Sequence, residues 1–197
     1  MKKLLPEWVY LIPDGAKKVF TGQIFDVYQW DQTLFDGTPA VFEMLKRPDT
    51  FQVIAIKDGK IVLVMDEQPG RKPNLSFPGG RAEESDDNWL NGAKRELLEE
   101  TGMTFKTWKL IKVGQPAPKI EWFTPIYIAY DFESQVAQKL DAGEKIEILE
   151  EDYAKIRDKV LSGKEPRLSY MQPTFLMYET IESLLVAPEL TSRELDR

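Results

Sequence analysis

The sequence predicts an α+β fold with a mixed β-sheet and a small antiparallel β region at its N-terminus. Strand and helix candidates interleave along the 197 residues, without the regular strand and helix alternation of a parallel, doubly wound sheet. Two Asp-Gly pairs, Asp36-Gly37 and Asp58-Gly59, each separate two strand candidates and are typical of tight hairpin turns.

The N-terminal part of the chain reads as consecutive short strands. Val19 to Trp30 and Pro39 to Leu45 flank the first turn, and Phe51 to Lys57 and Ile61 to Met65 flank the second. Runs rich in β-branched and aromatic residues between turn signals favour antiparallel hairpins. We therefore expect a small β region over residues 1–47 and a main domain over residues 48–197.

The rest of the chain predicts further strands and three helices. Pro125 lies inside one of these strands and predicts an edge or bulged strand, because proline cannot donate to the ladder. In order, the expected elements are a loop from Asp66 to Ser76, a strand ending at Phe77-Pro78-Gly79-Gly80, a helix up to Gly102, strands from Phe105 to Val113, Trp122 to Tyr130 and Lys145 to Leu149, helices from Glu151 to Leu161 and Thr174 to Leu185, and a frayed acidic tail from Thr191 to Arg197.

Three carboxylates crowd the first of these helices. Glu96, Glu99 and Glu100 stand at i, i+3 and i+4, so all three project from one face at about 3.6 residues per turn. Like charges at this spacing repel unless a cation lies between them. Magnesium and manganese favour carboxylate and carbonyl oxygens and commonly join them to substrate phosphates. The spacing therefore indicates a divalent-cation site, with Mg²⁺ expected and Mn²⁺ as the alternative.

Local signals support the helix itself. Ser85-Asp86-Asp87 offers a helix start, Leu90, Ala93 and Leu97 form an apolar stripe, and Gly102 offers a stop. An ordinary solvated acidic helix is the plain alternative, but it does not explain why these signals occur together with the three glutamates.

The stretch around these glutamates resembles the Nudix box. Its carboxyl half, Arg95-Glu96-Leu97-x-Glu99-Glu100-x-Gly102-Met103, matches the box at every fixed position. The resemblance implies a Nudix hydrolase with an α/β/α sandwich around a mixed β-sheet. It also implies that Glu96, Glu99, Glu100 and the backbone carbonyl of Gly79 hold the metal, and that Glu99 and Glu100 are catalytic. Arg95 matches a family arginine that orients the glutamates, so the resemblance implies the same role here. The alternative for Arg95 is a simple i, i+4 ion pair with Glu99.

The amino half of the box departs from the family pattern. Counting back from Arg95 places the first acidic position at Asp87, whereas counting forward from Gly80 places it at Asp86. One residue is therefore inserted in the loop, and aspartate replaces the usual glutamate. The departure concerns the loop geometry more than the metal site, because this acidic residue is usually less critical in the family than the helix glutamates.

The region before the box resembles the branch of ADP-ribose pyrophosphatases and nucleoside diphosphate sugar hydrolases. The shared pattern is a glycine, a strand, an apolar-Asp-Gly turn, a strand ending in glutamate and a short linker. Here it reads Thr21-Gly22-Gln23-Ile24, Leu34-Phe35-Asp36-Gly37, Val41-Phe42-Glu43 and Lys46-Arg47-Pro48-Asp49. In that branch the N-terminal strands mediate dimerisation, so the resemblance implies a homodimer formed through residues 1–47.

Three more residues are assigned by resemblance to this branch. Arg71, in Glu67-Gln68-Pro69-Gly70-Arg71, matches an arginine that holds the substrate and is a candidate contact to phosphate or ribose. Glu121 matches a glutamate after a loop, and is a candidate substrate-binding residue facing the metals. Glu144 resembles a loop glutamate that acts as the general base. For Arg71 and Glu144, a solvated loop residue is the alternative.

Composition removes several classes of chemistry. The chain has no cysteine and no histidine, which excludes disulfides, thiolate nucleophiles, zinc knuckles and a histidine general base. The formal net charge of -7 disfavours binding to long nucleic acid, which needs clustered cations. The chain has no stretch of membrane-spanning length and no signal-peptide pattern, so we expect a cytoplasmic protein without a membrane partner.

The expected reaction is metal-dependent hydrolysis of the diphosphate bond in a small nucleoside diphosphate linked to another moiety, with ADP-ribose or a nucleotide sugar as substrate. The products would be a nucleoside monophosphate and a sugar phosphate. A nucleoside triphosphate pyrophosphatase of the pool-cleaning kind is the alternative, favoured by Phe77-Pro78-Gly79-Gly80 and disfavoured by the region before the box. A non-catalytic Nudix-fold nucleotide sensor is disfavoured, because such modules typically lose box glutamates that this chain keeps.

Overall fold

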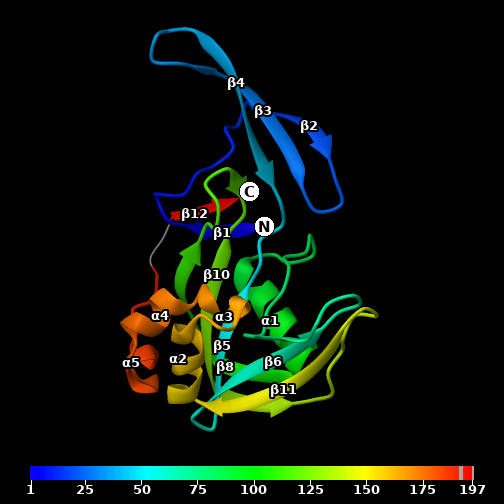
Figure 1. Ribbon diagram of the computed structural model, residues 1–197, viewed down its shortest axis with the longest axis vertical. Helices are drawn as coiled ribbons and strands as arrows, with labels where there is room; N and C mark the ends of the chain where they lie inside the picture. The colour runs from blue at the N-terminus through cyan, green and yellow to red at the C-terminus, as the bar shows by residue number, and fades with distance from the viewer. Residues whose placement is uncertain (191–192, 197) are drawn as a thin grey trace.

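A six-stranded mixed sheet forms the centre of the main body in the computed structural model, which describes residues 1–190 and 193–196 (Figure 1). The strand order is β11-β6-β5-β10-β8, with β7 paired to β6. β10 runs parallel to β5, and the other pairs are antiparallel. The strands are β5 (Gln52–Lys57), β6 (Lys60–Glu67), β7 (Asn74–Ser76), β8 (Met103–Gly114), β10 (Thr124–Gln135) and β11 (Lys145–Asp152).

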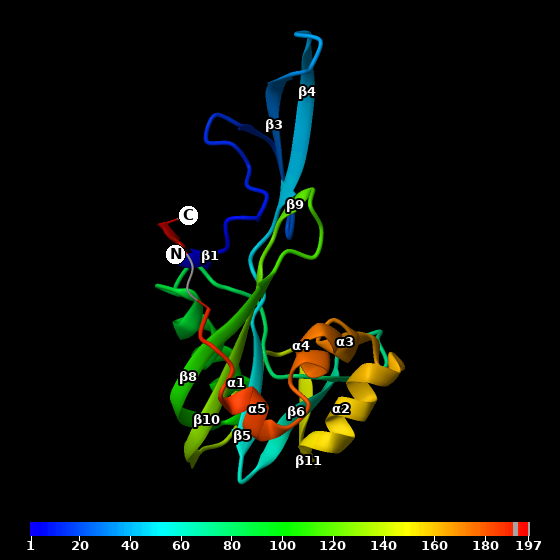
Figure 2. The ribbon, with the colours of Figure 1, turned by 90° about the vertical axis from the view of Figure 1, so that its left-hand side faces the viewer.

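Helices cover both faces of this sheet, and each face has its own apolar core. On one face, Ala93 and Leu97 of α1 (Trp89–Thr101) pack against β5, β8 and β10. On the other face lie α2 (Tyr153–Ser162), α3 (Pro166–Ser169), α4 (Gln172–Met177) and α5 (Ile181–Leu185), whose buried side chains form the second core (Figure 2). The predicted α+β class, with a mixed sheet between helical layers, is confirmed.

A second, four-stranded sheet projects from one end of the main body (Figure 1). Its order is β2-β3-β4-β9, and the first three strands are antiparallel. The last, β9, comes from the middle of the chain and pairs in parallel with β4. The strands are β2 (Lys17–Thr21), β3 (Asp26–Thr33), β4 (Pro39–Lys46) and β9 (Ile120–Glu121).

The chain ends meet near the junction of the two sheets. β1 (Lys2–Leu5) pairs antiparallel with β12 (Arg193–Asp196), as Figure 1 shows. The expectation of a frayed acidic tail is therefore wrong for residues 193–196, because their backbone pairs with the N-terminal strand. The rest of that tail, Thr191, Ser192 and Arg197, lies outside the described residues.

Two predicted elements are interrupted in the structure. The expected strand from Val19 to Trp30 is split into β2 and β3 by a turn in which Gly22 N–H donates to the Phe25 carbonyl. The expected helix from Thr174 to Leu185 is split into α4 and α5. Thr180 causes the second break, because its side chain and that of Ser183 form a capping box that starts a new helix.

Other local predictions hold. Asp58 and Gly59 both have positive φ, as a tight hairpin turn of this type requires. The strand containing Pro125 is bulged between Ile126 and Tyr127, although it is not an edge strand, because β5 and β8 lie on either side of it. Among the described residues, no helix is long and apolar enough to cross a membrane.

Candidate active site

A glycine-containing loop and α1 together build the site. Gly79 has a φ of 144°, and a Cβ there would collide with the backbone carbonyl of Phe51, so only glycine fits. α1 begins later than expected: Asn88 is the N-cap, and its side chain accepts a hydrogen bond from Asn91 N–H at 2.9 Å. The predicted stop is confirmed, because Gly102 caps the helix with a φ of 70°.

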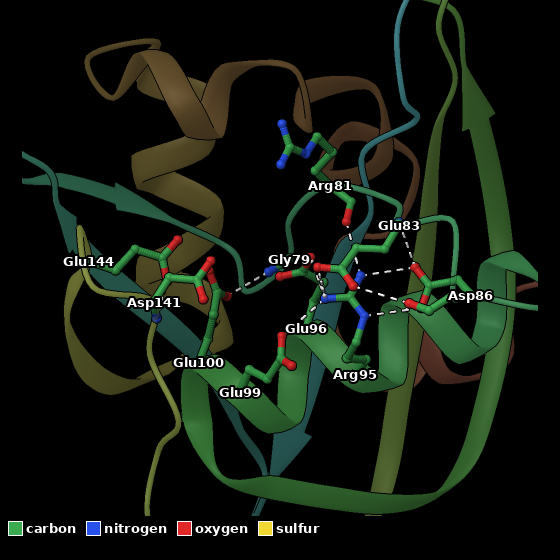
Figure 3. A network of polar contacts seen from close by, with 11 residues as sticks. Gly79, Arg81, Glu83, Asp86, Arg95, Glu96, Glu99, Glu100, Asp141 and Glu144 are labelled. Carbon is green, nitrogen blue, oxygen red and sulfur yellow. Dashed lines mark hydrogen bonds and ion pairs between the residues drawn. The ribbon is translucent and has the colours of Figure 1, made fainter. Parts of the chain in front are cut away.

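The three glutamates of α1 are partly buried and face the loop that carries Gly79 (Figure 3). Glu100 accepts a hydrogen bond from Gly79 N–H at 2.8 Å. Glu96 and Glu99 each accept one from Arg95 Nη1, at 2.9 and 3.0 Å. The expected i, i+4 ion pair between Arg95 and Glu99 is thus present. The structure brings together Gly79, Arg95 and all three glutamates.

Arg95 also ties α1 to the loop before it. Its Nε and Nη2 donate to the two carboxylate oxygens of Asp86, at 3.0 and 2.9 Å, and Nη2 donates to the Arg81 carbonyl at 3.0 Å. Burial opposes ionisation of Asp86, but the hydrogen bonds from Arg95 lower its pKa below the ordinary value. The hydrogen bond to Asp86 also raises the pKa of Arg95, so the pair stays ionised.

The geometry decides between the two candidate first acidic residues. Asp86 is 6% exposed and contacts Arg95, whereas Asp87 is exposed. Counting forward from Gly80 therefore identifies the residue in the site. The inserted residue is accommodated after it, before the N-cap at Asn88, where it does not disturb the glutamates.

Burial and repulsion between carboxylates raise the pKa of two of the three glutamates. Burial raises the pKa of Glu96 to about 7, with repulsion from Glu99 and Glu144 adding to the effect. Burial raises the pKa of Glu100 to about 8, with Glu96, Glu144 and Asp66 adding to it. A cation placed among these groups would relieve the repulsion.

The donor set fits a hard divalent cation. Carboxylate oxygens are the preferred ligands of Mg²⁺ and Mn²⁺, and three of them lie on one turn of α1 next to the loop backbone. Within residues 1–190 and 193–196, no group of three acidic side chains already encloses a metal position. Arg95 and Gly79 hold the glutamates instead, so binding requires small side-chain rearrangements.

Glu144 and Arg71 lie beside the same hollow. They line a cavity of about 420 Å³ between the loop after β6 and the loop before β11. Figure 3 shows Glu144 next to Glu100, on the side of the site away from Asp86. Its carboxylate accepts a long hydrogen bond, 3.4 Å, from Asp141 N–H. The structure thus places Glu144 beside the acidic cluster and Arg71 in the cavity that Glu144 also lines.

Glu121 lies elsewhere. It belongs to β9, is 1% exposed, accepts a hydrogen bond from Ile12 N–H at 2.8 Å and forms an ion pair with Lys46 at 2.9 Å. The pairing of β9 with β4 draws this residue into the junction between the two sheets. The structure does not bring it together with the glutamates of α1.

Arg47, which the sequence analysis did not propose as a site residue, lines a larger cavity. Arg47 stacks on Trp122, 4.4 Å from the ring centroid, and on Phe25 at 5.6 Å. It lines a cavity of about 640 Å³ between the small sheet and the loop before α1, together with Tyr28. The pattern Lys46-Arg47-Pro48-Asp49 contains Arg47 but does not indicate this stack, because the aromatic neighbours come from distant parts of the chain.

Comparisons with known proteins identify a family and relatives of similar fold. The family model described as the NUDIX domain matches residues 46–164, more than half of the chain. The ADP-ribose pyrophosphatase of Bacillus subtilis (strain 168) is 29% identical over 140 residues, 69% of this chain and 75% of that protein. The methanol dehydrogenase activator of Bacillus methanolicus is 28% identical over 139 residues, 68% of this chain and 75% of that protein. A crystal structure of an ADP compounds hydrolase superposes with a TM-score of 0.62 at 18% identity, covering 83% of this chain and 92% of that one.

Proposed function

This chain belongs to the Nudix hydrolase family, and we propose that it cleaves the diphosphate bond of a nucleoside diphosphate linked to another moiety, with ADP-ribose or a nucleotide sugar as substrate. One observation carries the proposal. Three carboxylates lie on one face of α1, two held by Arg95 and one by the Gly79 N–H, and a loop carboxylate, Glu144, lies beside Glu100 (Figure 3).

In this proposal the acidic cluster holds a divalent cation. Nudix hydrolases generally depend on divalent metals, and Glu96, Glu99, Glu100 and the Gly79 carbonyl are the residues that would bind one here. A bound Mg²⁺ or Mn²⁺ supplies charge to neutralise the diphosphate and to lower the pKa of an attacking water. Arg95 and Asp86 keep the glutamates oriented before and after each turnover.

Glu144 is the proposed general base. Its loop position at the edge of the acidic cluster lets it approach a water over the diphosphate, where it accepts the proton that the attack releases. Arg71, on the opposite side of the same hollow, is proposed to contact phosphate or ribose. The products are then a nucleoside monophosphate and a sugar phosphate: AMP and ribose 5-phosphate in the case of ADP-ribose.

The nucleoside part of the substrate has a candidate place in the 640 Å³ hollow. Arg47 and Tyr28 offer a guanidinium plane and an aromatic ring, which suit the face of a base. Glu121 stays a predicted substrate-binding residue without support from this geometry, because Ile12 and Lys46 already engage it in the junction.

We also propose that residues 1–47 mediate a homodimer. The small sheet exposes several large apolar side chains, among them Val19, Phe20 and Val41, which are half or more exposed. Exposed apolar side chains on one small sheet favour a protein interface there.

The alternative reaction is pyrophosphate release from a nucleoside triphosphate. The sequence Phe77-Pro78-Gly79-Gly80 favours it, whereas the exposed apolar sheet before the box favours the first proposal. A non-catalytic nucleotide sensor is the least supported reading, because the chain keeps all three helix glutamates and their arginine.

Replacing the box glutamates tests the proposed chemistry. Glu99→Gln and Glu100→Gln should each lower the Mg²⁺-dependent turnover of ADP-ribose by about 10²-fold or more while the fold is kept, because each removes a charge that acts on the diphosphate. Glu150→Gln is the matched control, because it also removes one carboxylate, but from β11, where Glu150 forms an ion pair with Lys57 of β5. Full activity of either box variant would contradict the proposal.

A further inference from the structure

A buried aspartate on β6 lies outside the helix that carries the glutamates. Asp66 is 8% exposed. Residues two apart on a strand share a face, so Asp66 lies on the same face as Val62, which packs in the core beneath α1 with Ala93 and Leu97. Asp66 also pairs with Asn74 of β7, the strand against which α3 packs, so both α1 and α3 lie near this end of β6.

Only one of the two carboxylate oxygens of Asp66 has a hydrogen-bond partner in the described part of the chain. Its Oδ2 forms an ion pair with Arg167 of α3. Its Oδ1 is buried and has no hydrogen-bond partner among residues 1–190 and 193–196. A buried acceptor without a partner is uncommon in folded proteins and points to a ligand that completes it.

Hydrogen bonds connect the backbone at Asp66 with the segments that carry Glu100 and Glu144. Asp66 pairs with Ile146 of β11, two residues after Glu144, and Gln138 Nε2 donates to the backbone carbonyls of both Ile146 and Glu100. These carboxylates come from α1, the loop before β11 and the end of β6. A cation between them would find a carboxylate on each of these three elements.

We propose that Asp66 is a further carboxylate of the divalent-cation site, with Arg167 fixing Oδ2 so that Oδ1 is left for the cation. The inference rests on the proposed function, because it assumes that the acidic cluster binds a metal. It adds a ligand group outside the box and outside the general-base loop.

A purely structural role for the pair makes a different prediction. If Asp66 and Arg167 served only to attach α3 to the sheet, removing either partner would break the same ion pair and would have the same effect. If Asp66 binds the cation, removing the Asp66 carboxylate and removing the Arg167 guanidinium change the cation affinity in opposite directions. Loss of the carboxylate removes a ligand, whereas loss of the guanidinium removes a competing positive charge.

The test is Mn²⁺ binding to the metal-free full-length chain, measured by isothermal titration calorimetry and by electron paramagnetic resonance of free Mn²⁺. Asp66→Asn should weaken Mn²⁺ binding by about 10-fold, the lower end of the loss seen when supporting residues of metal sites are changed. Arg167→Gln should bind Mn²⁺ at least as tightly as the wild type. Glu150→Gln, which removes an equal charge on β11, should match the wild type.

The outcomes separate this inference from the proposed function. Equal binding by Asp66→Asn and the wild type would overturn the inference alone, as would equal weakening by Arg167→Gln and Asp66→Asn. A wild-type chain that bound no Mn²⁺ would overturn the proposed metal site, and the inference with it. If Asp66→Asn does not fold, judged by circular dichroism, the Arg167→Gln result decides.

Discussion

The guanidinium of Arg95 donates two parallel hydrogen bonds to the carboxylate of Asp86, from Nε at 3.0 Å and from Nη2 at 2.9 Å. The same guanidinium holds Glu96 and Glu99 through Nη1. One side chain thus connects the loop before α1 to two of the carboxylates that the helix presents. The order of the site depends on this pair.

We expect Arg95→Lys and Asp86→Asn to cost stability and activity together. Lysine cannot reproduce the two-pronged contact, and asparagine cannot accept both hydrogen bonds. In a double-mutant cycle, the coupling in the free energy of unfolding should be about 1 kcal/mol or more, because the pair is largely buried. Urea denaturation of the four proteins measures it. The exposed pair of Lys155 and Glu151 is the control, with an expected coupling below about 0.5 kcal/mol. Equal couplings would contradict the assigned role.

The two adjacent glycines should respond differently to alanine. In Gly79→Ala the new Cβ meets the Phe51 carbonyl at a positive φ, so we expect a loss of unfolding free energy on the order of 3 kcal/mol. In Gly80→Ala the three atoms nearest to the new Cβ all belong to the carboxylate end of Glu96, which can move away. Gly80→Ala should therefore keep the melting temperature but displace Glu96 and lower turnover by about 10²-fold. Thermal melts and turnover of both variants decide; an active Gly80→Ala enzyme would contradict the placement of Glu96.

The metal-free protein should lose stability as the pH rises. Folding raises the pKa of Glu96 to about 7 and of Glu100 to about 8, from an ordinary 4.5, mainly through burial. Between about pH 4.5 and pH 8 the folded chain holds protons that the unfolded chain has released, so the free energy of unfolding falls with pH. Differential scanning calorimetry in chelator should show a steeper fall for the wild type than for Glu100→Gln, which lacks the titrating carboxyl. Mg²⁺ should reduce the difference, because it stabilises the ionised form. If the free energy of unfolding fell equally with pH in the wild type and in Glu100→Gln in chelator, the raised pKa of Glu100 would be contradicted.

The small sheet should hold two copies of the chain together. Light scattering at micromolar concentration should give twice the 22.7 kDa mass of the chain. Val41→Lys places a charge at a residue that is 66% exposed in the small sheet, and should yield a monomer. Val136→Lys is the matched control, because Val136 is similarly exposed but lies outside this sheet. A monomeric wild type would contradict the dimer.

The features that follow from local chemistry could be predicted from the sequence. The spacing of Glu96, Glu99 and Glu100 sets their common face, Gly102 ends the helix through its own positive φ, and Asp58-Gly59 makes its turn without distant partners. These predictions needed only periodicity and turn geometry.

The features that depend on distant pairing could not be predicted. β1 and β12 come from opposite ends of the chain, and neither carries a signal that names its partner. Glu121 was expected to face the metals, but its position depends on the pairing of β9 with β4. Asp66 was read as the start of a loop, whereas β6 continues to Glu67 and pairs Asp66 with Ile146 of β11. Such positions depend on tertiary register rather than on local residue type.

We propose that this Nudix hydrolase cleaves a nucleoside diphosphate joined to a sugar. Product release tests the proposal directly, followed by ³¹P nuclear magnetic resonance and chromatography, from ADP-ribose, nucleotide sugars, dinucleoside polyphosphates and nucleoside triphosphates, with Mg²⁺, with Mn²⁺ and with chelator. We expect metal-dependent release of a nucleoside monophosphate and a sugar phosphate, with ADP-ribose or a nucleotide sugar preferred. Preference for triphosphates, or tight nucleotide binding with no turnover in either metal, would contradict it.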